Sequence, residues 1–185
     1  MSEFIFAPGC TATLGGMPLS WTTIDSPIGE LLLVGSPEGV VRIAFECEDL
    51  DDVRRNISDR TGEQLEPGPL GQAEKQLAEY FAGQRREFNL PLDWRLSTGF
   101  RAQVQRALTG IAYGETQTYG QLAQRVGSPT AVRAVGSGCA TNPLPIVVPC
   151  HRVLRSDGSL GGYRGGLEIK QYLLKLESGN APTSG

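Results

Sequence analysis

The chain has 185 residues, 39% of them hydrophobic, enough for one sizeable domain or two small ones that share an interface. No apolar run approaches the roughly 20 residues that span a bilayer, and the first residues lack the basic and apolar segments of a secretion signal, so we expect a cytoplasmic protein with no membrane partner. The net charge is −3, but residues 1–97 sum to −8 (8 Lys and Arg against 16 Asp and Glu) and residues 98–185 to +5 (9 against 4), which suits a polyanionic partner or reflects unequal solvation of two surfaces.

The first half reads as strands followed by a helix. Residues 1–18 are rich in glycine and show no periodicity. From residue 19 to residue 46, short β-type runs are broken by the turn signals "SPIG" at 26–29 and "SPEG" at 36–39, which predicts a meander of antiparallel strands. The acidic stretch over residues 46–52 is interpreted as a solvated loop or the start of a helix.

A helix is predicted between residues 68 and 84, where Leu70, Ala73, Leu77 and Phe81 recur at helical spacing. The stretch over residues 87–94 looks extended. Residues 1–97 therefore form a small α+β unit.

The second half, residues 98–185, begins where the charge balance changes, and we place the domain boundary there. Thr98 can cap a helix over residues 100–109. Helices over 119–126 and 130–139, joined by a Gly-Ser-Pro turn, form a helix-turn-helix. Many helical domains share this pattern without touching nucleic acid.

The third of these helices is built almost entirely from small residues, with Arg133 as the exception. Two interpretations stay open: close packing against another helix, or a smooth surface that enters a narrow groove while Arg133 reaches further. The small residues are Ala131, Ala134, Gly136, Ser137, Gly138 and Ala140.

The four cysteines, Cys10, Cys47, Cys139 and Cys150, show no CxxC spacing, and His151 is the single histidine of the chain. Such a set cannot form a conventional zinc cluster, so we expect neither a metal nor another cofactor. Reduced thiols are the default inside a cell, so a special cysteine should be reactive rather than bridged.

The segment "IVVPCHRVL" over residues 146–154 combines a β-branched run with a cysteine and a histidine. We expect residues 146–148 to be a buried strand that ends at Pro149 and places Cys150 where the chain turns. Neighbouring residues on a strand point to opposite sides, so coupling Cys150 to His151 needs a turn or a bridging water. A histidine that acts as a base should have a carboxylate on its other nitrogen. By itself, the string favours a buried, unreactive cysteine beside a hydrogen-bonded histidine.

Six separated motifs favour the interpretation of Cys150 as a reactive cysteine. "YGE" at 113–115, "TYGQLA" at 118–123, "RAVG" at 133–136, "NP" at 142–143, "PCHRV" at 149–153 and "GYRGG" at 162–166 occur in that order. The chain resembles the O6-alkylguanine-DNA alkyltransferases, densely over residues 98–178 and loosely over residues 20–178.

The resemblance implies an α+β protein with a ribonuclease H-like N-terminal unit, whose sheet we expect to be antiparallel, and a helical C-terminal DNA-binding domain. Such a protein reverses DNA damage directly: it binds the minor groove, flips out the alkylated guanine and moves the alkyl group irreversibly to its own cysteine. O4-alkylthymine is a second candidate substrate. The implied partner is double-stranded DNA, bound by a monomer, with cooperative binding left open.

Carried over by motif, the resemblance makes Cys150 the alkyl acceptor and His151 its base, acting through a bridging water. Glu177 supplies the carboxylate on His151. Tyr119 rotates the nucleotide and donates a hydrogen bond to the leaving guanine, and Asn142 is the hinge between the recognition helix and the reactive segment.

The DNA contacts implied are those of Arg133, which fills the space of the flipped nucleotide, and of Tyr119. The small residues on the same helix that face the groove are Ala131, Ala134, Gly136 and Ser137. The substrate pocket falls on Val153, Tyr163 and Arg164.

Three positions depart from the family pattern: Gln105, Ala112 and Arg164. The segment "GGYRGG" over residues 161–166 is expected to be a flexible pocket rim, a tight turn before the last helix, or both. On such a rim Arg164 either folds over the opening or reaches a DNA phosphate, and we favour the phosphate.

Two other functions remain as alternatives. A non-catalytic module that recognises alkylated DNA and recruits repair proteins would not need Cys150. A cysteine hydrolase would use Cys150 and His151, but the helix-turn-helix and the basic second half do not support it.

Overall fold

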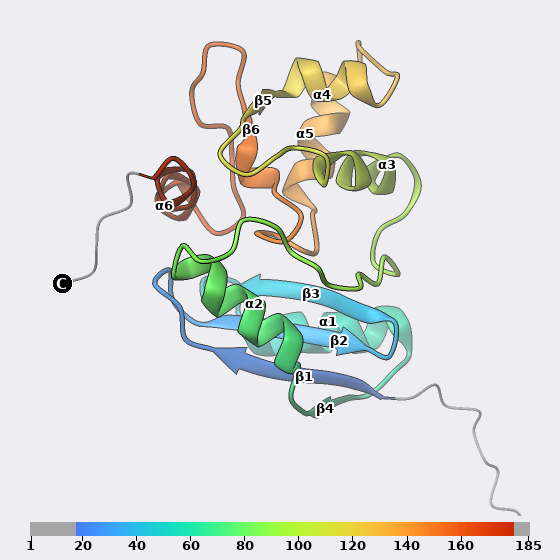
Figure 1. Ribbon diagram of the computed structural model, residues 1–185. Coiled ribbons are helices and arrows are strands. Elements are labelled where there is room, and N and C mark those ends of the chain that lie inside the picture. The colour runs from blue at the N-terminus through green and yellow to red at the C-terminus, as the bar shows by residue number, and fades with distance from the viewer. Residues whose placement is uncertain (1–17, 180–185) are drawn as a thin grey trace, which may run out of the picture.

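The computed structural model describes residues 18–179. The prediction for residues 1–18, and Cys10 with it, therefore lies almost wholly outside the described residues. Figure 1 shows a sheet with one helix in front of it and one behind it, and a group of helices above, with residues 82–98 running between the sheet and this upper group.

Three consecutive strands form the predicted antiparallel meander: β1 (Leu19–Ile24), β2 (Leu31–Ser36) and β3 (Gly39–Phe45). The expectation of a purely antiparallel sheet is wrong, because β4 (Leu65–Pro67) pairs with β1 in parallel and gives the order β3-β2-β1-β4. The chain reaches β4 through a helix, α1 (Leu50–Thr61), and a crossover of this kind is what a parallel pair requires. The acidic stretch before α1 is a helix start, since the Asp49 carboxylate accepts a hydrogen bond from the backbone of Asp52.

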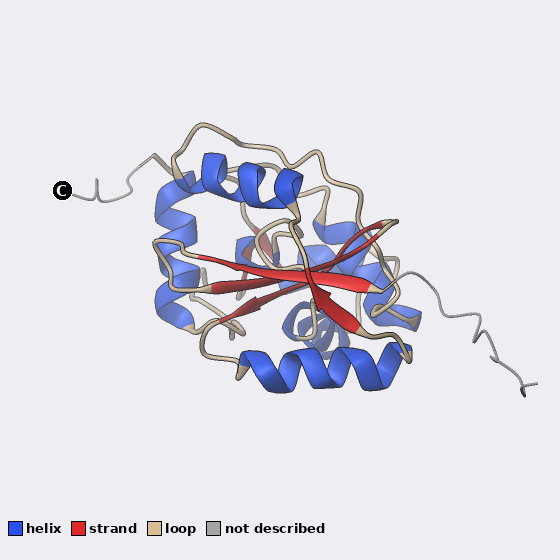
Figure 2. Cartoon of the chain, turned by 90° about the horizontal axis from the view of Figure 1, so that it is seen from below, coloured by secondary structure: helices blue, strands red, loops and turns tan. Residues whose placement is uncertain are grey.

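The sheet is covered on both faces by helices, α1 on one and α2 (Gly71–Phe81) on the other (Figure 2). Successive residues of β2 alternate between two hydrophobic clusters: Leu32 and Val34 pack with Ile57 of α1, whereas Leu31 and Leu33 belong to the cluster that contains α2. This second cluster continues into the C-terminal half, which β3 also contacts directly, since the Ile43 amide donates to the Pro143 carbonyl (2.9 Å).

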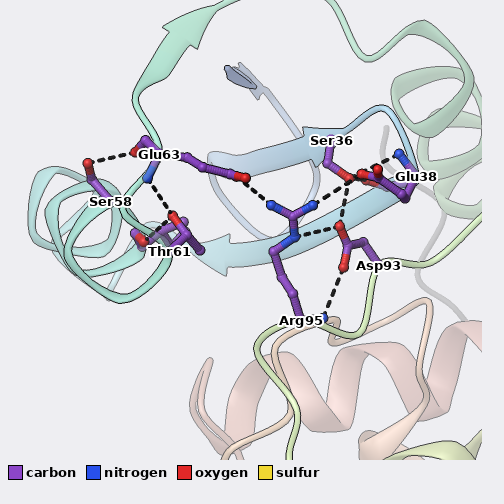
Figure 3. A network of polar contacts seen from close by, with 9 residues as sticks. Ser36, Glu38, Ser58, Thr61, Glu63, Asp93 and Arg95 are labelled. Atoms are coloured by element: carbon purple, nitrogen blue, oxygen red, sulfur yellow. Dashed lines mark hydrogen bonds and ion pairs between the residues drawn. The ribbon is translucent and has the colours of Figure 1, made fainter. Parts of the chain in front are cut away.

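The connection between the halves is held to the sheet by a polar network (Figure 3). Arg95 forms ion pairs with Asp93, Glu63 and Glu38. The Ser36 hydroxyl donates a 2.7 Å hydrogen bond to Asp93. The preceding stretch is extended as expected, with an isolated parallel bridge between Val40 and Leu92.

Three helices of the C-terminal half agree with the predicted ranges within a few residues: α3 (Gly99–Leu108), α4 (Tyr119–Arg125) and α5 (Val132–Ala140). The last helix is α6 (Leu167–Glu177). Thr98 precedes α3, but its side chain makes no capping hydrogen bond, contrary to expectation. Thr118 instead forms a capping box with Gln121 at the start of α4. A short parallel pair, β5 (Gln117–Thr118) and β6 (Val153–Leu154), joins the helix-turn-helix to the reactive segment. The boundary between residues 97 and 98 stays a prediction.

The predicted strand over residues 146–148 is wrong. These residues form turns, with Ile146 at a φ of 74°, although Ile146 and Val148 are fully buried. The side chain of Asn142 supplies hydrogen bonds that a neighbouring strand would otherwise provide, by donating to the Val148 carbonyl (2.8 Å) and accepting from the Leu144 amide (3.0 Å). The apolar run is therefore buried as turns, and it leads into a 3₁₀ turn, η1 (Cys150–Arg152).

Candidate active site and DNA-binding face

The thiol of Cys150 lies at the start of η1 and is almost completely buried, with 6% of the residue exposed. Burial raises the pKa of Cys150 above its ordinary value, and the hydrogen bond from Asn142 and the positive charge of Lys170 oppose that rise. The Asn142 amide nitrogen is 3.2 Å from the sulfur. The resting thiol is therefore protonated at neutral pH and needs a base before it can attack.

His151 is fully buried, and its Nε2 atom is 2.8 Å from Oε1 of Glu177, the carboxylate that the motif comparison assigns to it. Burial lowers the pKa of His151, and the bond to Glu177 only partly offsets this. An ionised carboxylate accepts hydrogen bonds, so we assign the ring proton to Nε2. Nδ1 has no hydrogen-bond partner among residues 18–179 and is left as a proton acceptor.

Glu177 is held by more groups than the sequence revealed. Arg152 donates to both carboxylate oxygens (2.8 and 2.9 Å), the Tyr80 hydroxyl donates to Oε1 (2.7 Å), and the Gly114 amide donates to Oε2 (3.2 Å). Burial opposes the ionisation of Glu177, but the hydrogen bonds from His151 and Arg152 outweigh it and hold the carboxyl pKa well below its ordinary value. Glu177 is thus a fixed anion that orients His151.

Of these partners, Arg152 could have been suspected only in part, and Tyr80 not at all. Arg152 belongs to the "PCHRV" motif, but nothing in the motif says that it faces the carboxylate. Tyr80 occupies an apolar position on α2, and no local signal distinguishes it from a core residue.

Lys170 of α6 is a buried charge that the sequence reading passed over. Its ammonium donates to the carbonyl oxygens of Val153 (2.7 Å) and Gly161 (3.4 Å), so it joins the reactive segment to the loop before α6. Burial lowers the pKa of Lys170. A lysine at this position of an amphipathic helix would ordinarily extend its ammonium to solvent.

A cavity of about 400 Å³ brings several of the predicted residues together. Tyr119, Gly136, Tyr163 and Arg164 line it. Val153, the other predicted pocket residue, is fully buried and is not among its lining residues. The Tyr163 hydroxyl is buried with no hydrogen-bond partner in the described part of the chain, so the rim of the cavity contains an unused polar group.

The segment over residues 161–166 is more tightly packed than a flexible rim. A Cβ atom on Gly161 would lie 2.4 Å from the Tyr119 hydroxyl, and one on Gly165 would lie 3.0 Å from the Phe45 ring. Gly166, with a φ of 92°, makes the turn into α6. Gly161 and Gly165 therefore serve close packing and Gly166 a turn, whereas a Cβ atom on Gly162 would meet nothing within 4 Å.

Arg164 is exposed on this segment, but its guanidinium makes contacts within the protein. Its guanidinium donates to the carbonyl oxygen of Ala140 (2.8 and 3.2 Å) and pairs with Glu48 of the N-terminal half (3.1 Å). The expectation of a solvated arginine that waits for a phosphate is at odds with these contacts, because both ends of the guanidinium already have partners.

The small residues of α5 serve both roles considered for them, close packing on the inner side and a smooth exposed surface on the outer side. Gly138 faces inward, where a Cβ atom would lie 2.8 Å from Val104 of α3, whereas a Cβ atom on Gly136 would meet nothing within 4 Å. On the outer side, Arg133, Ala134 and Ser137 are exposed, and Ala131 and Gly136 are partly exposed. Arg133 forms no ion pair with any residue that the structure describes. Its long charged side chain is therefore available on the exposed face of α5, among small residues.

The two remaining departures from the family pattern have simple structural accounts. Gln105 is buried and donates to the Gly138 carbonyl (3.1 Å), which helps to hold α3 against α5. Ala112 is exposed. Within residues 18–179 there is no cluster of three potential metal ligands and no helix able to cross a membrane.

Comparison with known proteins covers both halves. The family model of the 6-O-methylguanine DNA methyltransferase ribonuclease-like domain matches residues 19–94, and that of the DNA binding domain matches residues 99–179. Methylated-DNA--protein-cysteine methyltransferase of Mycolicibacterium paratuberculosis is 43% identical over 166 residues, which are 90% of this chain and 96% of the relative. The constitutive enzyme of that name from Bacillus subtilis is 42% identical over 158 residues, 85% of this chain and 94% of the relative.

Solved structures agree with this. The crystal structure of Mycobacterium tuberculosis OGT in complex with DNA has a TM-score of 0.77 and 42% sequence identity, and the match covers 88% of this chain and 95% of that one. The O6-methylguanine-DNA methyltransferase of the archaeon Pyrococcus kodakaraensis has a TM-score of 0.68 and 29% identity.

Proposed function

The chain belongs to the 6-O-methylguanine DNA methyltransferase family, and we propose on that basis that it repairs DNA by moving the alkyl group from O6 of guanine to Cys150. Its two matched regions together cover most of residues 19–179. The protein acts as a single-turnover enzyme rather than as a binding module.

The observation that carries this proposal is the burial of two neighbouring residues, Cys150 and His151, with the Asn142 amide on the sulfur and Glu177 on Nε2 of the imidazole. Nδ1 of His151 takes the thiol proton, through a water molecule as the resemblance implies, while Nε2 keeps its proton on Glu177. The sulfur then attacks the alkyl carbon in line, a sulfur–carbon bond forms, and the carbon–O6 bond breaks with its electron pair moving to the guanine. The Tyr119 hydroxyl donates a hydrogen bond to the leaving base.

The product explains why the protein acts once. A thioether offers no good leaving group to water or to another thiol, so the alkyl group stays on Cys150. The neutral His151 supports the first step, since a histidine already protonated could not accept the thiol proton.

Access to the lesion requires extrusion of the nucleotide, because O6 of a stacked guanine is out of reach of a buried thiol. Extrusion opposes a few kcal/mol of stacking and pairing. Arg133, exposed on α5 and without an ion-pair partner among the described residues, is suited to fill the vacated stack. The small outer face of α5 fits the minor groove, where little base identity is read, as suits a protein that repairs any sequence.

The partner is double-stranded DNA that contains alkylated guanine, with O4-alkylthymine as a further substrate, and the protein acts as a monomer in the cytoplasm. The excess of basic residues after residue 97 supports the DNA partner. The non-catalytic alternative would leave the pairing of Cys150 with a base and a carboxylate without a purpose.

The test is intact-mass measurement after incubation with a duplex that contains O6-methylguanine. We expect the mass to rise by one methyl group, on the peptide that holds Cys150, with at most one equivalent per protein. Cys150→Ser should abolish the gain, and the matched control Cys139→Ser, at a second buried cysteine, should keep it. Repeated turnover, or a methyl group found on Cys139, would contradict the mechanism.

A further inference from the structure

We propose that Tyr80 is a positioning residue for alkyl transfer, whose hydroxyl aligns Glu177 and, through it, His151. The inference rests on the proposed function. It gives the N-terminal half, which supplies none of the residues so far placed in the reaction, a direct part in it.

The geometry places Tyr80 inside the catalytic network. Its hydroxyl is 2.7 Å from Oε1 of Glu177, the same oxygen that lies 2.8 Å from Nε2 of His151, although Tyr80 and Glu177 are 97 residues apart in the chain. An ionised carboxylate only accepts, so the hydroxyl donates. Burial and the charge of Glu177 raise the pKa of Tyr80 well above its ordinary value, so the hydroxyl keeps its proton.

The ring of Tyr80 is held firmly. It is fully buried and packs against Phe81, Phe88 and Tyr113, with ring centroids 5.5, 5.3 and 6.1 Å away. On α2 it continues the face formed by Ala73 and Leu77, which packs on the sheet. The hydroxyl therefore approaches Glu177 from a fixed direction that the C-terminal half cannot supply.

The Tyr80 hydroxyl competes with Nε2 of His151 for Oε1 of Glu177. Arg152 donates to the same Oε1 atom at 2.9 Å, so three donors share its negative charge. Each hydrogen bond to Oε1 weakens the other hydrogen bonds that this oxygen accepts. The Tyr80 hydroxyl therefore reduces the tendency of Glu177 to hold His151 protonated. Besides Glu177, the charges that bear on His151 are those of Arg152 and Lys170, and both favour the neutral ring.

The rate test uses Tyr80→Phe, which keeps the ring and removes the hydroxyl. With free O6-benzylguanine as the alkyl donor, we expect the rate on Cys150 to fall about fivefold at neutral pH, the order expected from one hydrogen bond. The acid limb of the pH–rate profile should move to higher pH, because a less satisfied Glu177 favours protonated His151. A residue that merely fills space would leave this limb where it is.

Tyr113→Phe is the matched control. Its ring touches that of Tyr80, but its hydroxyl donates to the backbone carbonyl of Leu176 at 3.3 Å and not to the carboxylate. For Tyr113→Phe we expect the alkylation rate and the acid limb of the pH–rate profile to equal those of the wild type. Equal effects of the two substitutions, or no effect of Tyr80→Phe, would overturn the proposal.

A second readout does not depend on activity. Because the chain has a single histidine, its ring resonances in a nitrogen-15 spectrum need no assignment. Tyr80→Phe should move the Nε2 proton resonance downfield, as the bond to Glu177 strengthens. If Tyr80→Phe does not fold, 3-fluorotyrosine at position 80, a stronger donor, should move the resonance upfield and the acid limb to lower pH. An unmoved resonance would overturn the proposal, whereas an unalkylated wild-type protein would contradict only the proposed function.

Discussion

The amide nitrogen of Asn142 lies 3.2 Å from the sulfur of Cys150, and the same nitrogen donates to the Val148 carbonyl at 2.8 Å. One side chain thus fixes the turn that carries the thiol and provides a donor to the sulfur. A thiolate accepts a hydrogen bond better than a thiol does, so this contact favours the charged form that burial disfavours.

Asn142→Ala should therefore raise the pKa of Cys150 further above its ordinary value. Loss of the donor is expected to slow alkylation by free O6-benzylguanine about tenfold at neutral pH, corresponding to about one pKa unit, and to shift the rise of rate with pH toward higher pH. The rate measured across pH checks this. Gln105→Ala removes another buried amide donor, one that bonds to the Gly138 carbonyl and not to sulfur, and should leave the pH dependence unchanged. An Asn142→Ala profile that is lower but not displaced would mean that the amide acts only on the turn.

Arg133→Ala should separate base extrusion from chemistry. Because only a duplex has a stack to fill, we expect repair of O6-methylguanine in duplex DNA to slow by at least about tenfold, while the reaction with free O6-benzylguanine keeps its rate. Single-turnover kinetics on both substrates measure the difference. Arg106→Ala, which removes a cation from α3 that lies over the Trp94 ring, is the control for a general loss of charge. Equal slowing on both substrates would place Arg133 in the support of the fold instead.

Local signals in the sequence predicted the C-terminal helices well, because the Gly-Ser-Pro turn and the helical spacing act within a few residues. They failed at two elements of the structure. The apolar run at 146–148 suggested a strand because the hydrogen bonds from Asn142 could not be foreseen. β4 was missed because a three-residue strand has no pattern of its own.

Some residues of the candidate site were likewise indicated by the sequence, and others were not. The motif order pointed to Cys150, His151 and Glu177, and the structure brings these three together. Tyr80 contacts Glu177, which lies 97 residues further along the chain. Lys170 contacts the backbone carbonyl of Val153, a group that every residue has. Neither contact produces a periodicity or a spacing in the sequence. The contacts of Arg164 could not be foreseen, because its partners, Ala140 and Glu48, come from two different halves of the chain.

Glu177→Gln should destabilise the fold in a pH-dependent way. The folded-state pKa of Glu177 lies below its unfolded value, so its stabilising contribution is complete above about pH 4.5 and is lost as the pH falls through the folded-state pKa. At neutral pH the variant leaves Arg152 buried without its counter-charge, and we expect the free energy of unfolding to fall by about 3 kcal/mol. Urea unfolding at several pH values should show the gap to wild type narrowing in acid. Glu168→Gln, at an exposed position of the same helix, should match wild type throughout. A gap that stays constant with pH would mean that the ionisation of Glu177 is not the cause.

The position of Arg164 leads to a prediction about the size of the alkyl group. Its guanidinium lines the cavity, bonds to the Ala140 carbonyl at the end of α5 and pairs with Glu48, so it holds the segment over residues 161–166 against both neighbours. Arg164→Ser should loosen this rim and raise the ratio of the O6-benzyl to the O6-methyl repair rate by about threefold, the order expected from a partly exposed ion pair. Glu48 keeps Arg42 as a partner, so the substitution leaves no unpaired buried carboxylate.

Both rates should be measured on one oligonucleotide sequence, with the salt dependence of DNA binding recorded for each variant. Glu48→Gln removes the charge partner of Arg164 but leaves both bonds to Ala140, so its effect on the ratio should be smaller than that of Arg164→Ser. The salt dependence of Arg164→Ser should equal that of wild type, because a guanidinium that is already paired within the protein releases no counterion from DNA. An unchanged ratio together with a shallower salt dependence would instead show that Arg164 leaves these partners for a phosphate when DNA binds.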